Sequence, residues 1–177
     1  YRLVGSSRQT HAGFVHLYVR RSWQASVEHL PSEVPGVAGV IVVNDVRVVV
    51  VAVHLEPTHL GAALRGKQLR GALHGRDNDT VVIMGDMNMV EKDATERVRH
   101  HALGEAVYDG LSWNPRVSRY LEWDAEGQPE RGQQYDRVWF RGSIFAYAYL
   151  VGNSRQFVDG QAFVLSDPFG VLALASV

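Results

Sequence analysis

The chain has 177 residues, of which 46% are apolar and 21% charged, with a net charge of −1 and no cysteine. This composition excludes general disorder, disulfides and cysteine-ligated zinc, and the length suits one domain over residues 1–177. The longest apolar run, Val48 to Val53, is too short to cross a bilayer, and the near-neutral charge argues against a broad basic surface for nucleic acid. We therefore expect a soluble, intracellular protein whose compartment the sequence does not indicate.

Valine-rich segments in the first half predict β-strands, because branched side chains pack well on a pleated surface. Residues 14–19 are the first such segment. The next two, residues 37–43 and 46–55, are separated only by Asn44 and Asp45, which suit a two-residue hairpin turn with positive φ angles. Since residues 46–55 have almost no polar positions, we expect a central strand that is covered on both faces.

A helix is predicted between Thr58, as its N-cap, and Gly75, just past its C-terminus. Its apolar stripe at helical spacing consists of Leu60, Ala63, Leu64, Ala72 and Leu73. Further strands are expected at residues 80–84, 135–140, 144–151 and 171–175. Residues 114–134 contain two prolines and two glycines among mixed charges, which predicts a long surface loop.

Polar residues that directly follow buried strands are informative, because ligands commonly bind at the rim of a sheet. His54 ends one predicted strand, although a single histidine is more often packed and bonded to a backbone carbonyl. Gly85 precedes Asp86 and Asn88, and this carboxylate and amide suit phosphate-ester hydrolysis, where they would orient water and hold a phosphoryl oxygen. The alternative is an Asx-type turn, in which Asp86 caps the following helix and Asn88 faces water.

A third polar segment, Ser166-Asp167-Pro168, comes shortly before the strand predicted at residues 171–175. Its carboxylate could bind a metal ion or orient a histidine, and a turn that feeds the strand is the alternative. These segments together resemble the motif succession of the endonuclease/exonuclease/phosphatase superfamily, and the finer features resemble its tyrosyl-DNA phosphodiesterase 2 branch. The residues that carry the resemblance are His54-Leu55-Glu56-Pro57-Thr58, Gly85-Asp86-Met87-Asn88, Leu111-Ser112-Trp113-Asn114, Tyr135-Asp136-Arg137-Val138-Trp139-Phe140-Arg141 and Ser166-Asp167-Pro168-Phe169-Gly170.

This resemblance implies a two-sheet α/β sandwich and, in active relatives, magnesium-dependent hydrolysis of phosphoester bonds by an attacking water. It implies that Asp86 positions or activates the water, that Asn88 holds the water and the phosphate, and that His54 touches the scissile phosphate. Asp167 would orient the histidine that normally follows it, and Asp86 and Asp167 are the candidate magnesium ligands.

The resemblance also implies two substrate-binding residues. Asp136 would help to shape the site. Trp113 would stack on a base or on the leaving aromatic group, with a buried core position as the alternative. We expect His54, Asp86, Asn88, Asp136 and Asp167 to converge on one cleft.

Two departures from the family pattern concern catalysis. Pro168 stands where the family has histidine, and proline can neither donate a hydrogen bond nor carry charge. The loss of one such donor typically lowers the rate on the order of 10²- to 10³-fold. The family's magnesium-binding glutamate belongs to a motif that precedes the region where this chain begins, and Glu28, Glu33 and Glu56 lie in the wrong motif context. We therefore expect an N-terminal part of the domain to be missing.

The sequence thus predicts a degenerate phosphodiesterase-fold domain that is catalytically impaired and serves as a structural or binding component, for example of a nucleoprotein assembly. The alternative is an active magnesium-dependent phosphodiesterase or nuclease whose metal site is completed by an upstream segment. Magnesium is the expected cofactor if the chain is active. The expected partners are nucleic acid or proteins, without a membrane.

Overall fold

The computed structural model describes residues 1–7, 14–58, 61–112, 132–142, 144–151, 155–158, 161–164 and 170–176. The described elements follow in the order β1 (Arg2–Ser6), β2 (His16–Val19), β3 (Gln24–Glu28), β4 (Gly36–Val43), β5 (Val46–His54), α1 (Ala62–Leu73), β6 (Thr80–Asp86), α2 (Glu91–His100), β7 (Gly104–Glu105), β8 (Asp136–Arg141), β9 (Phe145–Val151), β10 (Arg155–Val158), β11 (Gln161–Val164) and β12 (Gly170–Ser176). None of the helices in these ranges is long and apolar enough to span a membrane.

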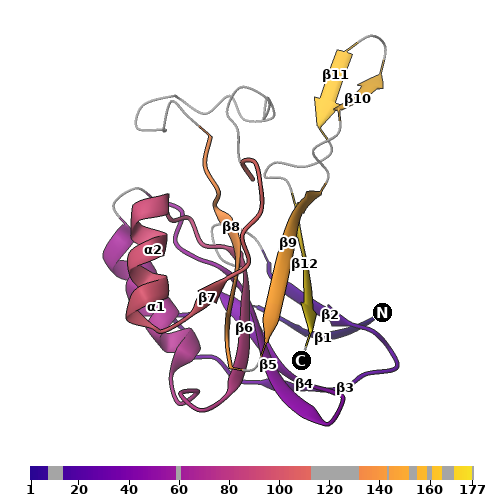
Figure 1. Ribbon diagram of the computed structural model, residues 1–177, viewed down its shortest axis with the longest axis vertical. Coiled ribbons are helices and arrows are strands. Elements are labelled where there is room, and N and C mark those ends of the chain that lie inside the picture. The colour runs from indigo at the N-terminus through magenta and orange to yellow at the C-terminus, as the bar shows by residue number, and fades with distance from the viewer. Residues whose placement is uncertain are drawn as a thin grey trace.

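The largest sheet has six strands in the order β3-β4-β5-β6-β8-β7. Only β5 and β6 are parallel, because α1 connects them, and the other neighbours are antiparallel. β5 therefore lies inside the sheet, between β4 and β6. Figure 1 shows this sheet nearly edge-on, with both helices on one side of it.

The predicted hairpin is confirmed in its position and its turn. β4 and β5 pair antiparallel up to Val43 and Val46, and the two residues between them have φ angles of 49° at Asn44 and 62° at Asp45. Positive φ at both turn residues matches the right-handed twist of the flanking strands. The strand expected after the helix is confirmed as β6, which lies beside β5 in the same sheet.

β5 is buried on both faces, as its apolar sequence predicted. Val49, Val51 and Val53 belong to the core cluster under the helices, with Leu69 of α1 and Ala94 of α2. The alternate residues belong to a second cluster on the opposite face of the sheet, which consists of Val48, Val50 and Ala52 with Leu17, Val19 and Ala148. The two-residue period of a strand thus supplies both cores from one segment.

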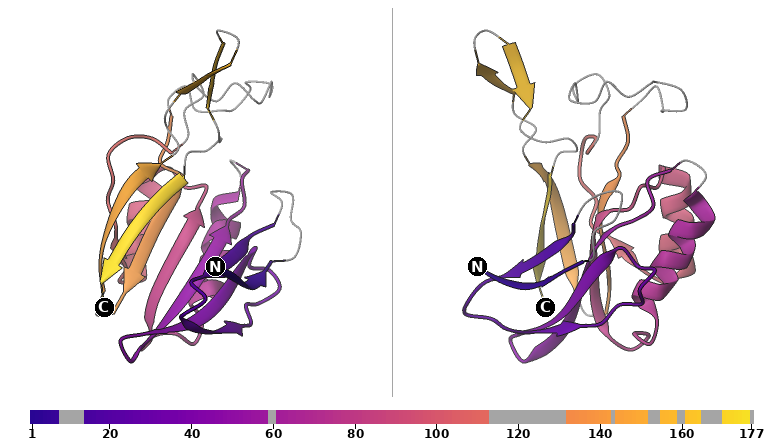
Figure 2. Two further views of the ribbon diagram at one scale, coloured as in Figure 1. Left: turned by 90° about the vertical axis from the view of Figure 1, so that its right-hand side faces the viewer. Right: turned by 180° about the vertical axis from the view of Figure 1, so that it is seen from behind.

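The second face of the sheet is covered by strands instead of helices. Two antiparallel pairs, β1-β2 and β9-β12, lie on the side away from α1 and α2 (Figures 1 and 2). The predicted two-sheet α/β sandwich is therefore confirmed. The β10-β11 hairpin projects beyond both layers (Figure 2).

The first helix differs from the prediction in its start and in its buried face. Gly75 has φ 72° and follows the helix as predicted, but the N-cap is Gly61 and not Thr58. Ala63 and Leu64 are exposed, and Leu60 lies outside the described residues. The buried face consists of Arg65, Gly66, Gln68, Leu69, Ala72 and Leu73. An apolar count missed this face because two of its polar residues bond the backbone of the preceding segment.

α2 was not predicted as an element, and a helix after Asp86 entered only with the Asx-turn alternative, but the structure has ten residues of helix there. Ala94 is its only buried residue, and most of the others are charged or polar. A helix with so small an apolar stripe leaves little periodic signal. Acidic residues in its first turn and basic residues in its last turn complement the helix dipole, and these were the available cue.

Candidate functional site

The six-stranded sheet brings three of the predicted site residues side by side. His54 at the end of β5 pairs with Asp86 at the end of β6, and Asp86 pairs with Asp136 at the start of β8. Because β8 runs antiparallel to β6, its first residue meets the last residue of β6 at the same rim of the sheet. The structure thus places these three residues together as the sequence predicted, and their chemical roles remain predictions.

Gly85 allows this close arrangement because no other residue fits its position. Its φ is 132°, which side chains of L-residues rarely tolerate, and an added Cβ would lie 2.0 Å from the carbonyl oxygen of Val53 on the neighbouring strand. The glycine therefore lets β5 and β6 stay paired up to His54 and Asp86.

His54 and Asp86 face each other directly. The distance between Nε2 of His54 and Oδ2 of Asp86 is 3.5 Å, and the side chains are 31% and 16% exposed. Burial lowers the pKa of His54 below its ordinary value of 6.5, and the charge of Asp136 opposes this effect. A neutral imidazole at the rim has one donor and one acceptor nitrogen, which suits contact with a phosphate ester.

Asn88 ties the ends of β5 and β6 together. Its φ is 50°, its backbone N–H donates to Oδ1 of Asp86 at 2.8 Å, and its side-chain amide donates to the carbonyl of Leu55 at 2.9 Å. The Asx-type turn is therefore present, but Asp86 does not cap α2, whose N-cap is Val90. The Asn88 amide nitrogen serves this cross-link and does not simply face water.

His54, Asp86 and Asp136 form a row across the three strands, and burial disfavours the ionised form of its two carboxyl groups. Burial raises the pKa of Asp86 to about 6, against the Asn88 backbone bond and the charge of Arg65, which lower it. Burial, followed by the charge of Asp86, raises the pKa of Asp136 to about 7, against the opposing effects of Ser112 and His54. Oδ2 of Asp136 is buried without a hydrogen-bond partner. A cation between these oxygens would relieve both penalties.

Magnesium fits the donors of this row. Mg²⁺ binds oxygen ligands and commonly uses one or two protein carboxylates with several waters, and Asp86 and Asp136 supply two. The sequence had paired Asp86 with Asp167 as ligands and had given Asp136 a substrate-binding role. Asp167, Pro168 and Trp113 lie outside the described residues. Within the described ranges, no group of three histidine, aspartate or glutamate side chains is placed to hold a metal ion.

Ser112 fixes the start of β8 and was not singled out from the sequence. It is fully buried, and its hydroxyl accepts the backbone N–H of Tyr135 at 2.9 Å and that of Asp136 at 3.0 Å. Tyr108 adds a bond from its hydroxyl to the Asp136 carbonyl at 2.7 Å. Ser112 does stand in the Leu111-Ser112-Trp113-Asn114 motif, so a signal was available, but its role depends on contacts across the chain.

A pocket of about 790 Å³ opens beside the row at His54. Its walls are the end of β1, the segment from Val27 to Val37, and the residues that follow β5, including Glu56. The lining is both polar and apolar, and Gln68 of α1 forms part of the wall. Of the three residues, His54 lines this pocket, which is large enough for a small ligand.

The raised pKa values predict a pH dependence of stability. The ordinary pKa of the two carboxyls is 3.8, against about 6 and 7 in the folded chain. Between these values the folded state binds more protons than the unfolded state, so their contribution to the free energy of unfolding falls as the pH rises from about 4 to about 7. Asp136→Asn removes one of these charges. Its free energy of unfolding should therefore rise by roughly 2–4 kcal/mol, relative to that of the wild type, as the pH goes from 4 to 8. Urea unfolding at both pH values measures this gain, and a constant difference would contradict it.

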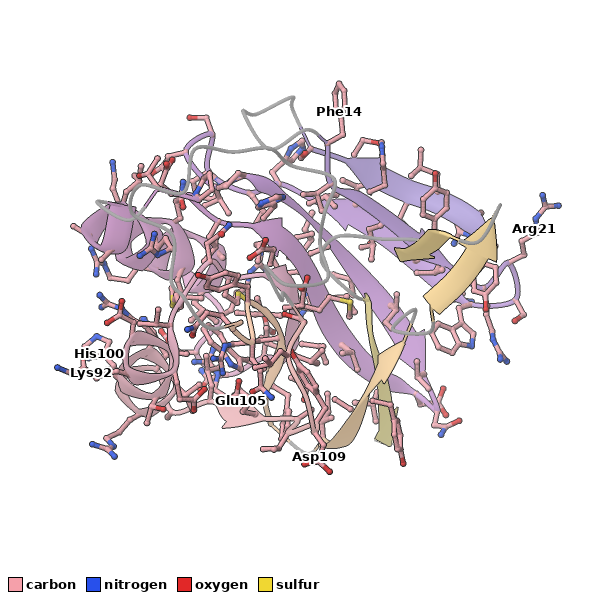
Figure 3. All side chains as sticks on the ribbon, turned by 90° about the horizontal axis from the view of Figure 1, so that it is seen from above. Phe14, Arg21, Lys92, His100, Glu105 and Asp109 are labelled. Carbon is pink, nitrogen blue, oxygen red and sulfur yellow. The ribbon has the colours of Figure 1, made fainter. Side chains whose placement is uncertain are left out.

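Magnesium should show the opposite pH preference in the same experiment. At pH 8 both carboxylates are ionised and the ion should raise the unfolding temperature, whereas at pH 4.5 it should not. Asp136→Asn should lose the shift. Asp109→Asn, which changes an exposed acid (Figure 3), should keep it.

No protein-family model matches the chain, and no curated protein matches it in sequence. Solved structures do match it. TDP2 from Caenorhabditis elegans is 14% identical with a TM-score of 0.64, over 97% of this chain and 56% of that one. TDP2 from D. rerio, complexed with a single-strand DNA product, is 14% identical with a TM-score of 0.62, over 87% of this chain and 67% of that one.

A third match extends the similarity to a different protein. A mutant of beta toxin from Staphylococcus aureus, with bound magnesium ions, is 13% identical with a TM-score of 0.55, over 81% of this chain and 59% of that one. The chain thus spans 56–67% of the length of these three structures. At such identities the likeness shows the fold.

Proposed function

On the endonuclease/exonuclease/phosphatase fold that this chain shares with TDP2 and beta toxin, we propose that the chain keeps a phosphodiester-binding site and has lost most of its catalytic power. The observation that carries the proposal is the row of His54, Asp86 and Asp136 on three adjacent strands. Pro168, at the position of the family's histidine, supports the loss of turnover. The domain would then serve as a binding component, for example of a nucleoprotein assembly.

The described side chains have separate tasks in this proposal. Asp86 and Asp136 hold the cation, and a bound magnesium ion would neutralise charge on the phosphate. His54 donates to a phosphate oxygen at the mouth of the pocket. Asn88 keeps Asp86 and the end of β5 in register through its two hydrogen bonds.

Nucleic acid is the ligand class that we propose for the site. The D. rerio TDP2 structure with a single-strand DNA product supports this choice. The net charge of −1 indicates a local, metal-assisted contact instead of a long electrostatic footprint, so affinity should depend on magnesium more than on salt.

A second candidate function, an active magnesium-dependent phosphodiesterase, is favoured by one observation. Burial raises the pKa of Asp86 to about 6, which lies near the range of a general base at neutral pH. Asp86 would then take a proton from the attacking water. An upstream segment would have to complete the metal site and offset the missing histidine.

An activity assay separates the two candidates. The chain, with magnesium, is incubated with a 5′-phosphotyrosyl oligonucleotide and with a simple phosphodiester, beside the Asp86→Ala variant. We expect turnover at or near background in both, because a transition-state donor is missing at Pro168. Turnover well above background that disappears in Asp86→Ala would establish the active candidate instead.

The binding half of the proposal is tested independently. Fluorescence anisotropy with a labelled 5′-phosphorylated single-stranded oligonucleotide should show saturable binding in magnesium and its loss in EDTA. Asp86→Asn should weaken this binding on the order of tenfold or more, as expected for a lost charged contact. Asp109→Asn is the control and should bind like the wild type. Binding that is equal in EDTA and magnesium would exclude the proposed site.

A further inference from the structure

The segment from His54 to Thr58 begins with the histidine of the site, at the end of β5, and leads from the sheet toward α1. On the sheet side its backbone is well held. The His54 N–H donates to the Pro35 carbonyl at 3.0 Å, and the Leu55 N–H donates to the Asp86 carbonyl at 2.9 Å. The Asn88 cross-link completes this side.

The other side of the segment is held by α1. Nη1 of Arg65 donates to two backbone carbonyls of the segment, that of Glu56 at 3.0 Å and that of Thr58 at 2.7 Å. Oε1 of Gln68 accepts the Glu56 N–H at 3.0 Å. Arg65 and Gln68 are three positions apart, so they lie on the same face of the helix.

Both helix residues are buried, which is unusual for their types. Arg65 is 5% exposed and Gln68 is 6% exposed. Nε of Arg65 is buried without a hydrogen-bond partner, so this guanidinium is retained at a cost in desolvation. A side chain used only to cover the core would not need this group.

The segment packs closely against the start of α1. A Cβ added at Gly61, the N-cap of α1, would lie 2.4 Å from Cγ of Glu56 and 3.2 Å from Nη1 of Arg65. A side chain at position 61 would therefore have to displace the Glu56 side chain and press on the Arg65 guanidinium.

From this geometry we propose that Arg65, assisted by Gln68, is a positioning residue that fixes the segment from His54 to Thr58 and thereby holds the His54 imidazole against Asp86. Arg65 does not touch the ligand in this arrangement. It acts through two backbone carbonyls, while the rim residues make the chemical contacts. That this positioning aids ligand binding rests on the function proposed above. The positioning of His54 by Arg65 is independent of that function.

The test uses the whole chain labelled with ¹³C-histidine, and the His54→Gln spectrum identifies the His54 ring signal. Arg65→Met removes the donors at similar length, Arg65→Lys keeps a cation with N–H donors, and Gln68→Met removes only the second contact. Arg70→Met changes an exposed arginine on the same helix and is the control. Hydrogen exchange is also measured on each variant at the Glu56 amide, whose N–H donates a hydrogen bond to Gln68.

We expect Arg65→Met to move the His54 ring signal and to speed exchange of the Glu56 amide on the order of tenfold or more, because a charged hydrogen bond anchors its segment. Arg65→Lys should restore part of both effects. Gln68→Met should speed exchange at Glu56 and move the ring signal by a smaller amount. Arg70→Met should change neither.

A His54 signal that stays in place in folded Arg65→Met would overturn the proposal, since it would leave Arg65 only a role in stability. If Arg65→Met does not fold, Gln68→Met decides, and an unchanged ring signal there counts against the proposal equally. Neither readout requires turnover or ligand. An activity assay without turnover therefore does not affect this test. An unchanged His54 signal, in turn, does not decide whether the proposed function is correct.

Discussion

Arg137→Met is expected to lower the free energy of unfolding by about 3–5 kcal/mol, the cost of breaking a buried ion pair by removing one partner. The Arg137 side chain is 2% exposed and binds Glu91 of α2 at 2.8 Å and Glu105 of β7 at 2.7 Å. Trp139 adds a bond from its indole nitrogen to the same Glu105 oxygen at 3.0 Å. The variant would lose the tie between α2 and the sheet and leave Glu105 without its cation.

The position of this network explains the size of the effect. Figure 3 shows Glu105 among other side chains, whereas Lys92 and His100 point outward from α2. The Glu91 carboxylate is 68% exposed and is screened by water, whereas Glu105 is 21% exposed, so loss of the Glu105 pair accounts for most of the expected effect.

Arg47→Met is the matched control, because Arg47 also forms two ion pairs, with Glu28 at 2.7 Å and Asp79 at 2.8 Å. Its side chain is 51% exposed, so its loss should lower the free energy of unfolding by about 1 kcal/mol or less. Adding Glu105→Gln to Arg137→Met should recover part of the stability. Urea unfolding gives all four values, and equal losses in the two single variants would show that burial does not set the difference.

Pro168→His is expected to raise phosphodiester turnover on the order of 10²- to 10³-fold, if the rest of the site is intact. The reason is chemical. The proteins that the chain's motifs resemble would have a histidine at this position as a transition-state donor, and proline supplies none. The measurement is the rate with magnesium on a 5′-phosphotyrosyl oligonucleotide and on a simple phosphodiester.

Two variants control this measurement. Pro168→Ala removes the proline without adding a donor, so it should stay at the wild-type rate, and Asp86→Ala in the Pro168→His chain should abolish the gain. A gain in Pro168→Ala of the same size would assign the effect to backbone restriction by the proline. No gain in Pro168→His would mean that the pocket has lost more than one histidine.

The hairpin and the central strand could be predicted from the sequence because their signals are local. Asn44 and Asp45 tolerate positive φ by themselves, and the unbroken valine run of β5 fits only a position with two covered faces. The resemblance of the motifs to the superfamily likewise pointed to His54, Asp86 and Asp136 before any contact between them was known. These features depend on residue type and on neighbours in the chain.

Only the tertiary structure decided how those residues meet and what supports them. The pairing of Asp86 with Asp136 results from the antiparallel entry of β8 beside β6, and it makes burial the main cause of both raised pKa values. Arg65 and Gln68 were absent from the predicted helix stripe, since a sequence records polarity but not the backbone carbonyls and N–H group that these side chains bind. Residue type thus determined the strands, the turn and which polar groups stand at the rim, whereas burial, charge coupling and the anchoring of His54 arose from contacts between segments far apart in the chain.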